Sequence, residues 1–71
     1  MKNKILISFS KKVRAERLKK GLSQEELAEK ACVHRTYIGM IERAEKNITL
    51  KNIEKISLAL KIKLSDLFNG L

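Results

Sequence analysis

The sequence predicts an all-α fold, namely a compact five-helix bundle formed by a single domain of residues 1–71. Apolar residues recur at helical spacing along nearly the whole chain, and no convincing alternating strand pattern is found. Proline is absent and glycine occurs only at positions 21, 39 and 70, so linkers, repeats and low-complexity segments are not evident. A chain of 71 residues is near the lower limit for one hydrophobic core without cross-links, which argues for one domain.

The first helix is expected from about Ser8 to Lys20. Gly21 follows it and suits the left-handed position at which many helices end. The β-prone run Ile5–Phe9 is interpreted as a frayed lead-in to this helix. The buried stripe of the helix is expected to comprise Leu6, Phe9 and Val13.

Two short helices joined by a tight turn are expected within residues 24–43. Ser23 and Glu26 have the spacing of a capping box, in which the hydroxyl and the carboxylate satisfy backbone N–H groups at a helix start. The segment Cys32–His34 interrupts the apolar pattern and is predicted to be the turn. The inner faces of the two helices are expected to carry Leu27, Ala28, Ala31, Ile38 and Ile41.

The C-terminal helices are expected within residues 50–69, with Thr49 capping the longer one and Ser65 capping a last turn, Asp66–Phe68. The predicted core, drawn from all the helices, is Phe9, Val13, Leu22, Leu27, Ala28, Ile38, Ile41, Ile53, Ile56, Leu60 and Leu67. Four apolar side chains near the C-terminus exceed what this core needs, and exposed apolar surface usually marks an interface. A homodimer interface is therefore predicted at Leu58, Leu64, Phe68 and Leu71; the alternative is that these residues complete the small core.

Two opposite charges fall on apolar helix faces. Arg17 continues the stripe of the first helix one turn after Val13, and Glu42 follows Ile38 by four residues. Either residue alone could lie on the surface. The coincidence of both favours an internal ion pair between Arg17 and Glu42.

The charge of the chain indicates a polyanionic partner. The net charge is +8, from 16 basic and 8 acidic residues, and nucleic acid is the simplest partner for such a balance. The alternative is a lysine-rich surface that only keeps the protein in solution. The charge is segregated, however, because the segment Arg35–Arg43 contains only Glu42 as an acid. This distribution favours a binding face.

No catalytic, metal or cofactor site is expected. Cys32 and His34 lie two residues apart and could suggest a nucleophile–base pair or metal ligands, but no third ligand lies nearby. No phosphate loop, carboxylate dyad or nucleophile motif occurs. Cys32 is interpreted as a small half-buried filler, and His34 as a helix cap or a phosphate neighbour. No run approaches the roughly 20 apolar residues of a membrane span. Ile5–Ile7 is too short for a secretory signal, so a cytoplasmic protein is expected.

The run RLKKGLSQEELAEKACVHRTYIGMIER, followed by NITLKNIEKISLALKIKLSDLF, resembles the Cro/phage-repressor (XRE-type) helix-turn-helix family. The resemblance covers about Phe9 to Gly70. The segments His34–Ile38 and Lys46–Thr49 are particularly similar to the small controller proteins of restriction–modification systems. The resemblance implies a lambda-repressor-like DNA-binding domain, a symmetric dimer, and a second motif helix placed in the major groove of DNA.

The resemblance also implies roles for individual residues. The family's buried Arg–Glu pair falls on Arg17 and Glu42, and its helix-2 glutamine, which contacts phosphate and supports the recognition helix, falls on Gln24. Base-reading positions fall on Arg35, Thr36 and Met40, with Tyr37 beside them; Arg35 could instead contact phosphate, and Tyr37 could pack at the helix edge. The predicted phosphate contacts are Gln24, His34, Arg43, Lys46 and Asn47.

The chain departs from the family pattern at four positions. Cys32 occupies the place of the turn glycine, and Ala44 and Lys61 stand where glycine caps are common. A positive φ at Cys32 would cost some stability. Gly39 lies inside the recognition helix at a cost of about 1 kcal/mol relative to alanine. It either permits close approach to a phosphate or base or only loosens the helix.

The first functional hypothesis is a sequence-specific transcriptional regulator that binds a palindromic site in double-stranded DNA as a homodimer. A restriction–modification controller is its sharpest version, followed by a phage-type repressor, with RNA polymerase as a further candidate partner and a nucleoid-associated location. The second hypothesis is an antitoxin-like module that binds a partner protein as well as DNA. The first is favoured because we expect no segment outside the DNA-binding domain to wrap a toxin. A third hypothesis is a basic helix bundle that rests on an anionic membrane. It is disfavoured because the chain lacks the apolar face with Trp and Phe that such a bundle would need.

Overall fold

The structure is a computed structural model, and it describes residues 3–71; the predicted domain therefore begins two residues outside the described range. The described chain is all-helical, as predicted, and contains no strand. Its helices are α1 (Lys4–Lys19), α2 (Gln24–Ala31), α3 (Arg35–Glu42), α4 (Leu50–Leu60) and α5 (Leu64–Leu67). None of the helices in this part of the chain has the length and apolar content needed to cross a membrane.

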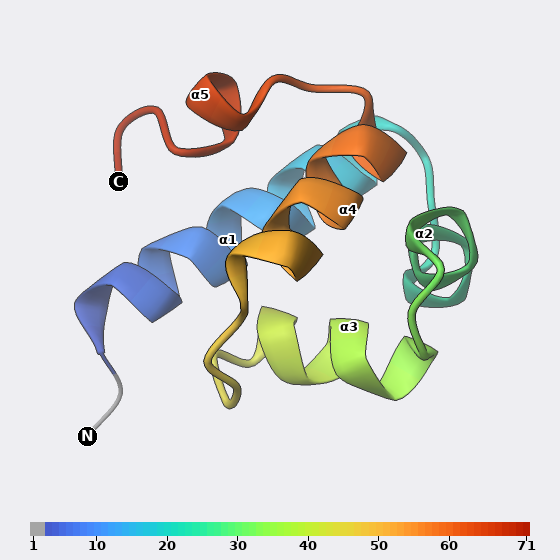
Figure 1. Ribbon diagram of the computed structural model, residues 1–71, viewed down its shortest axis with the longest axis horizontal. Helices are drawn as coiled ribbons and strands as arrows, with labels where there is room; N and C mark the ends of the chain where they lie inside the picture. Colours follow the sequence, from blue (N-terminus) through green and yellow to red (C-terminus); the bar gives the residue numbers. More distant parts are fainter. Residues whose placement is uncertain (1–2) are drawn as a thin grey trace.

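The helices pack around one core, with α3 at one side of the molecule and α5 at the opposite side (Figure 1). Helix α2 packs against α3 and α4, and α1 packs against α3 and α5. The predicted core is confirmed except at Leu22, which is only partly buried. The fully buried side chains at its centre are Val13, Leu27, Ile38, Ile56, Leu60 and Leu67.

Helix α1 begins earlier than predicted. The side chain of Asn3 accepts a hydrogen bond of 2.9 Å from the backbone N–H of Ile5, which caps the helix at its true start. The run Ile5–Phe9 is thus part of the helix and is not a frayed lead-in. The β-propensity of these residues is overridden because the cap and the packing of Phe9 against the core both favour the helical backbone.

Helices α1, α2, α3 and α4 all end in the same way, with a residue in the left-handed conformation just after the helix. Gly21, Cys32, Ala44 and Lys61 all have φ between 56° and 69°, in the left-handed region. After each of them, the next backbone N–H donates to the carbonyl five residues earlier, as Val33 does to Ala28 at 3.0 Å. The three non-glycine residues adopt this conformation at a cost of about 1–2 kcal/mol each. The positive φ considered for Cys32 is thus present, and Ala44 and Lys61, which stand where the family often has glycine, share it.

Two further predictions were wrong. Cys32 is exposed and does not fill a half-buried space, because the left-handed turn directs its short side chain away from the core. Ser65 does not cap the last turn. Helix α5 starts at Leu64, with Lys63 at the cap position and no side-chain cap hydrogen bond, so Ser65 lies inside the helix where its hydroxyl cannot cap the start. The predicted cap at Thr49 is present, accepting from the N–H of Asn52 at 3.2 Å.

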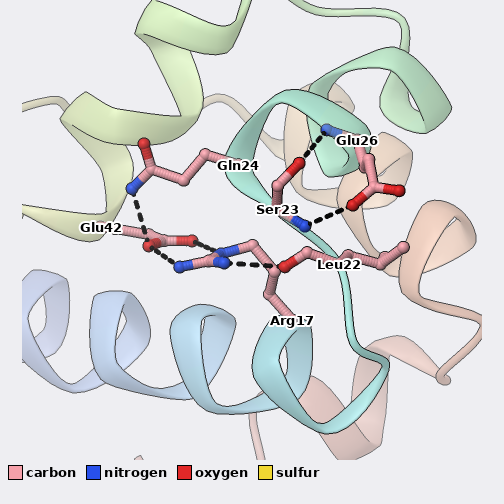
Figure 2. Close-up of polar contacts among 6 residues, drawn as sticks. All are labelled: Arg17, Leu22, Ser23, Gln24, Glu26 and Glu42. Carbon is pink, nitrogen blue, oxygen red and sulfur yellow. Dashed lines mark hydrogen bonds and ion pairs between the residues drawn. The ribbon is translucent and has the colours of Figure 1, made fainter.

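An internal ion pair joins α1 to α3, as the two apolar stripes predicted. Arg17 Nε donates to Glu42 Oε2 at 2.7 Å, and Arg17 Nη2 donates to Glu42 Oε1 at 3.0 Å, so the pair is bidentate (Figure 2). The side chains are only 9% and 4% exposed. The hydrogen bonds that Arg17 donates to Glu42 raise the pKa of Arg17 above its ordinary value, against the effect of desolvation.

The pair has partners on both sides, so that neither charge is left unsatisfied in the interior. Arg17 Nη1 donates to the carbonyl of Leu22 at 2.8 Å, and Gln24 Nε2 donates to Glu42 Oε1 at 3.1 Å (Figure 2). Arg17, Glu42 and Gln24 belong to α1, α3 and α2 respectively. The polar cluster therefore holds α3 in a fixed position against the two preceding helices.

The variant Arg17→Ala is expected to lower the free energy of unfolding by about 3–5 kcal/mol, because it leaves the carboxylate of Glu42 buried without its charge partner. Thermal or urea unfolding followed by circular dichroism measures the loss. Lys20→Ala, which removes a positive charge from an exposed position at the end of the same helix, is the matched control. Equal melting temperatures for the two variants would show that the ion pair does not contribute.

Candidate nucleic-acid interface

The start of α2 is fixed by the predicted capping box. The hydroxyl of Ser23 accepts from the N–H of Glu26 at 3.0 Å, and Glu26 Oε1 accepts from the N–H of Ser23 at 2.9 Å (Figure 2). The hydrogen bond from the backbone N–H of Ser23, and after it the effect of the Ser23 hydroxyl, lower the pKa of the Glu26 carboxyl below its ordinary value. The box fixes the backbone from which Gln24, the first residue of α2, extends toward α3.

The start of α3 is capped by His34. Its Nδ1 accepts a hydrogen bond from the backbone N–H of Thr36 at 3.0 Å. A ring nitrogen that accepts a hydrogen bond carries no proton, so a neutral ring that makes this bond has its N–H at Nε2. His34 therefore acts as a cap, one of the two roles considered for it, and its Nε2–H remains the donor with which it could meet a phosphate.

The four predicted base-reading residues differ in exposure. Arg35 and Thr36 are exposed, whereas Tyr37 and Met40 are half-buried. The hydroxyl of Tyr37 accepts a hydrogen bond of 3.0 Å from Asn52 Nδ2 of α4, so Tyr37 packs at the helix edge. Arg35 Nη1 lies 3.4 Å from Glu25 Oε2 of α2, and both side chains are mostly exposed. Arg35 and Thr36 are thus the side chains of this set that are most available to a partner.

An open hollow lies between α2 and α3. It is lined by Arg35 and Arg43, whose side chains are 68% and 55% exposed, and by Ser23 and Gln24. The remaining residues that line it are Arg17, Glu25, Thr36 and Gly39. Because the exposed side chains of Arg35, Arg43 and Thr36 can donate hydrogen bonds and Glu25 is the one acid among the residues that line it, the hollow suits an anionic group such as a phosphate.

The loop after α3 adds exposed donors beside this hollow. Arg43 is half-exposed, and its Nε lies 3.1 Å from Glu45 Oε2. Lys46 and Asn47 are exposed on the same loop. The structure therefore brings the predicted DNA-contacting residues together on α2, α3 and this loop.

The predicted dimer residues lie elsewhere, on the C-terminal part of the fold. Leu58 of α4 is 71% exposed, and Leu64, Phe68 and Leu71 are each between 37% and 39% exposed. Phe68 also stacks on Phe9, with ring centroids 5.6 Å apart, so it contributes partly to the core. These residues lie at the end of α4, on α5 and in the segment that follows it, and α5 is on the opposite side of the molecule from α3 (Figure 1).

Sequence reasoning missed three supporting contacts: Asn52 with Tyr37, Glu25 with Arg35, and Glu45 with Arg43. The spacing of Glu25 and Arg35 carried no signal, because they lie on different helices joined by a turn whose geometry was unknown. Among residues 3–71, no group of three His, Cys, Asp or Glu side chains is placed to hold a metal ion.

Comparison with known proteins places these features in context. The helix-turn-helix family model matches residues 13–67. The control protein C.BamHI of Bacillus amyloliquefaciens is 50% identical over 70 residues, covering 97% of this chain and 86% of that protein. The crystal structure of the restriction-modification controller protein C.AhdI from Aeromonas hydrophila is 43% identical, with a TM-score of 0.87 over 89% of this chain and 91% of that one.

A second similar structure contains DNA. The restriction-modification controller protein C.Esp1396I, solved as a tetramer in complex with its natural 35 base-pair operator, is 38% identical to this chain with a TM-score of 0.88. The match covers 93% of this chain and 87% of that one. The fold bearing the hollow and the recognition helix is therefore shared with a protein that was solved on its operator.

The capping box of α2 predicts a pH dependence of stability. Because folding lowers the pKa of Glu26, its ionised form stabilises the fold at neutral pH, and this contribution is lost as the pH falls through the lowered pKa. The melting temperatures of the wild type and Glu26→Gln should therefore differ at neutral pH and converge in acid. The control is Glu29→Gln, which removes a charge from the same helix and leaves the box intact. If the difference in melting temperature between the wild type and Glu26→Gln stayed constant over the whole pH range, the stabilising role of the ionised Glu26 carboxylate would be contradicted.

Proposed function

The chain belongs to the helix-turn-helix family, and we propose that it is a sequence-specific DNA-binding transcriptional regulator. It binds a palindromic operator as a homodimer, with α3 in the major groove of double-stranded DNA. The observation that carries this proposal is the exposed face of α3, where Arg35 and Thr36 border a donor-lined hollow. The only acid of α3, Glu42, is turned inward and paired with Arg17.

The biological role that fits best is that of a restriction–modification controller. The support is the identity of 50% to the control protein C.BamHI and of 43% to the controller protein C.AhdI, over most of each chain. Such a regulator would govern its own operon and the gene of a restriction enzyme. RNA polymerase is a further partner in this proposal, and the cytoplasm, at the nucleoid, is the location. The comparisons give no support to the antitoxin-like alternative.

Base reading is assigned to the outward side of α3. Arg35 is long enough to donate a bidentate pair to guanine O6 and N7, which is worth roughly 1–3 kcal/mol of discrimination. Thr36, exposed beside it, suits a thymine methyl group or a phosphate. Met40 can contribute only apolar contact. The hydroxyl of Tyr37 accepts a hydrogen bond from Asn52. Tyr37 therefore either reads DNA from a fixed position or supports α3 from its edge.

Phosphate contacts are assigned to the residues around the hollow and its adjoining loop. They set the position of the protein on the duplex and carry no direct sequence information. Gln24 is already oriented by Glu42, and His34 presents Nε2–H at the start of α3. The assigned residues are Gln24, His34, Arg43, Lys46 and Asn47.

The dimer is assigned to the exposed apolar side chains on α4 and near the C-terminus. Leu58 contributes the largest exposed fraction, 71%, and Leu64 lies near it beside a shallow hollow. Phe68 and Leu71 complete the surface. A two-fold axis through this surface would present two α3 helices to half-sites about one helical turn apart.

The function is tested by selecting bound duplexes from a random DNA pool with the purified protein at near-physiological salt. The expected result is a two-fold symmetric motif, because a symmetric dimer reads two copies of one half-site. The motif can then be sought upstream of the gene itself and of a restriction enzyme gene. Binding without enrichment, vanishing as the salt concentration rises, would mean charge-driven contact only and would overturn the proposal.

Two substitutions separate base reading from phosphate contact. Arg35→Ala is expected to relax the preference at one position of each half-site by about 1–3 kcal/mol.

Lys46→Ala should weaken binding to all sequences alike and lower the salt slope by about one. Repeating the selection and titrating salt with each variant measures both effects. A changed preferred sequence for the lysine variant would contradict its assignment to phosphate.

A further inference from the structure

Gly39 lies in the middle of α3, is buried, and lines the hollow between α2 and α3. Glycine is unfavourable inside a helix relative to alanine, because it loses more backbone freedom on folding. Its backbone here is helical and has no positive φ, so the turn geometry does not require glycine at this position. The explanation must therefore lie in the space that its missing side chain leaves.

That space is occupied by the side chains of Arg43 and Gln24. A Cβ added at Gly39 would lie 3.0 Å from Arg43 Nη1 and 3.5 Å from Gln24 Oε1. Arg43 follows Gly39 by four residues, which places it one helical turn further along the same face. The guanidinium of Arg43 therefore turns back over the bare backbone of α3 and points toward the start of α2.

The guanidinium of Arg43 is paired with an acid on the loop side, and an amide oxygen of α2 lies near the same space. Glu45 Oε2 lies 3.1 Å from Arg43 Nε on the loop side. On the α2 side, Gln24 donates through Nε2 to Glu42 Oε1, and this bond turns its Oε1 toward Gly39 and the guanidinium. Arg43 thus lines the hollow while paired with Glu45, and Gln24 Oε1 borders the same space over Gly39.

We infer that Gly39 is a positioning residue for DNA backbone recognition: its missing Cβ admits the guanidinium of Arg43 to the α2–α3 hollow, where Arg43 and the start of α2 bind one phosphate. This inference rests on the proposed function. With a Cβ at position 39, only 3.0 Å from Arg43 Nη1, the guanidinium would have to shift from its place over the backbone of α3, and its alignment with a phosphate in the hollow would be lost.

The variant Gly39→Ala has opposite effects on stability and binding. The added Cβ meets the far end of a flexible side chain, so the protein folds, and alanine raises the melting temperature. The affinity for the selected operator, measured by fluorescence anisotropy, falls by about tenfold, as expected for the loss of a hydrogen bond to a charged group. The salt slope falls by about one. Unchanged affinity or a lowered melting temperature would overturn the inference.

The double variant Gly39→Ala with Arg43→Ala tests whether the effect passes through Arg43. In the Arg43→Ala background, Gly39→Ala should still raise the melting temperature but should cause no further loss of affinity. An equal loss in both backgrounds would show that Gly39 acts independently of Arg43. If the wild type itself selects no operator, the proposed function has failed, and not only this assignment.

Arg43→Lys supplies a test that leaves Gly39 unchanged. Lysine keeps the charge but lacks the planar fork with which Arg43 meets Glu45 and the hollow at once. Affinity should fall by about as much as in Gly39→Ala. Wild-type affinity for Arg43→Lys would mean that charge alone suffices and that the position of the guanidinium does not matter.

Discussion

The buried contact between Arg17 and Glu42 is the interaction on which the arrangement of the helices depends. Its two charges are almost completely removed from solvent, and each has hydrogen bonds beyond the pair itself. An apolar pair of similar volume could be equally stabilising, so stability alone does not account for it. The polar cluster differs from apolar packing in having one satisfied geometry. It sets the distance and rotation of α3 relative to α1 and α2, and hence the direction in which Arg35 and Thr36 point.

The connections between the helices complete this placement at some cost in backbone strain. The left-handed residue after α1 is a glycine, but Cys32, Ala44 and Lys61 adopt the same conformation with side chains. Each position is over-determined by a backbone hydrogen bond across the helix end and by the packing of the helices on either side. The strain at Cys32 allows a turn tight enough for α2 and α3 to pack against each other with the hollow between them.

Much of this fold could be predicted because its determinants are local. The capping box at Ser23, the cap at Thr49 and the apolar spacing within each helix are visible within a few residues of sequence. Arg17 and Glu42 could be paired because each interrupts an apolar stripe. The start of α1 could not be predicted from propensity alone. Asn3 is a favourable cap, but the residues that follow it are β-prone and obscure the helical signal. The contacts of Tyr37 with Asn52 and of Arg43 over Gly39 depend on how helices and loop meet, which no spacing in the sequence reports.

Three arginines of the candidate interface region each face one acid, and their burial separates their roles. Arg17 and Glu42 are buried, so separating them is costly and the contact is permanent. Arg35 with Glu25 and Arg43 with Glu45 are between 45% and 71% exposed, and pairs of this kind are worth about 0–1 kcal/mol. Such weak contacts can hold an arginine in a defined direction before DNA arrives and exchange it for a base or a phosphate at little cost. The acids next to the binding face thereby limit the conformational freedom that DNA binding would otherwise have to remove.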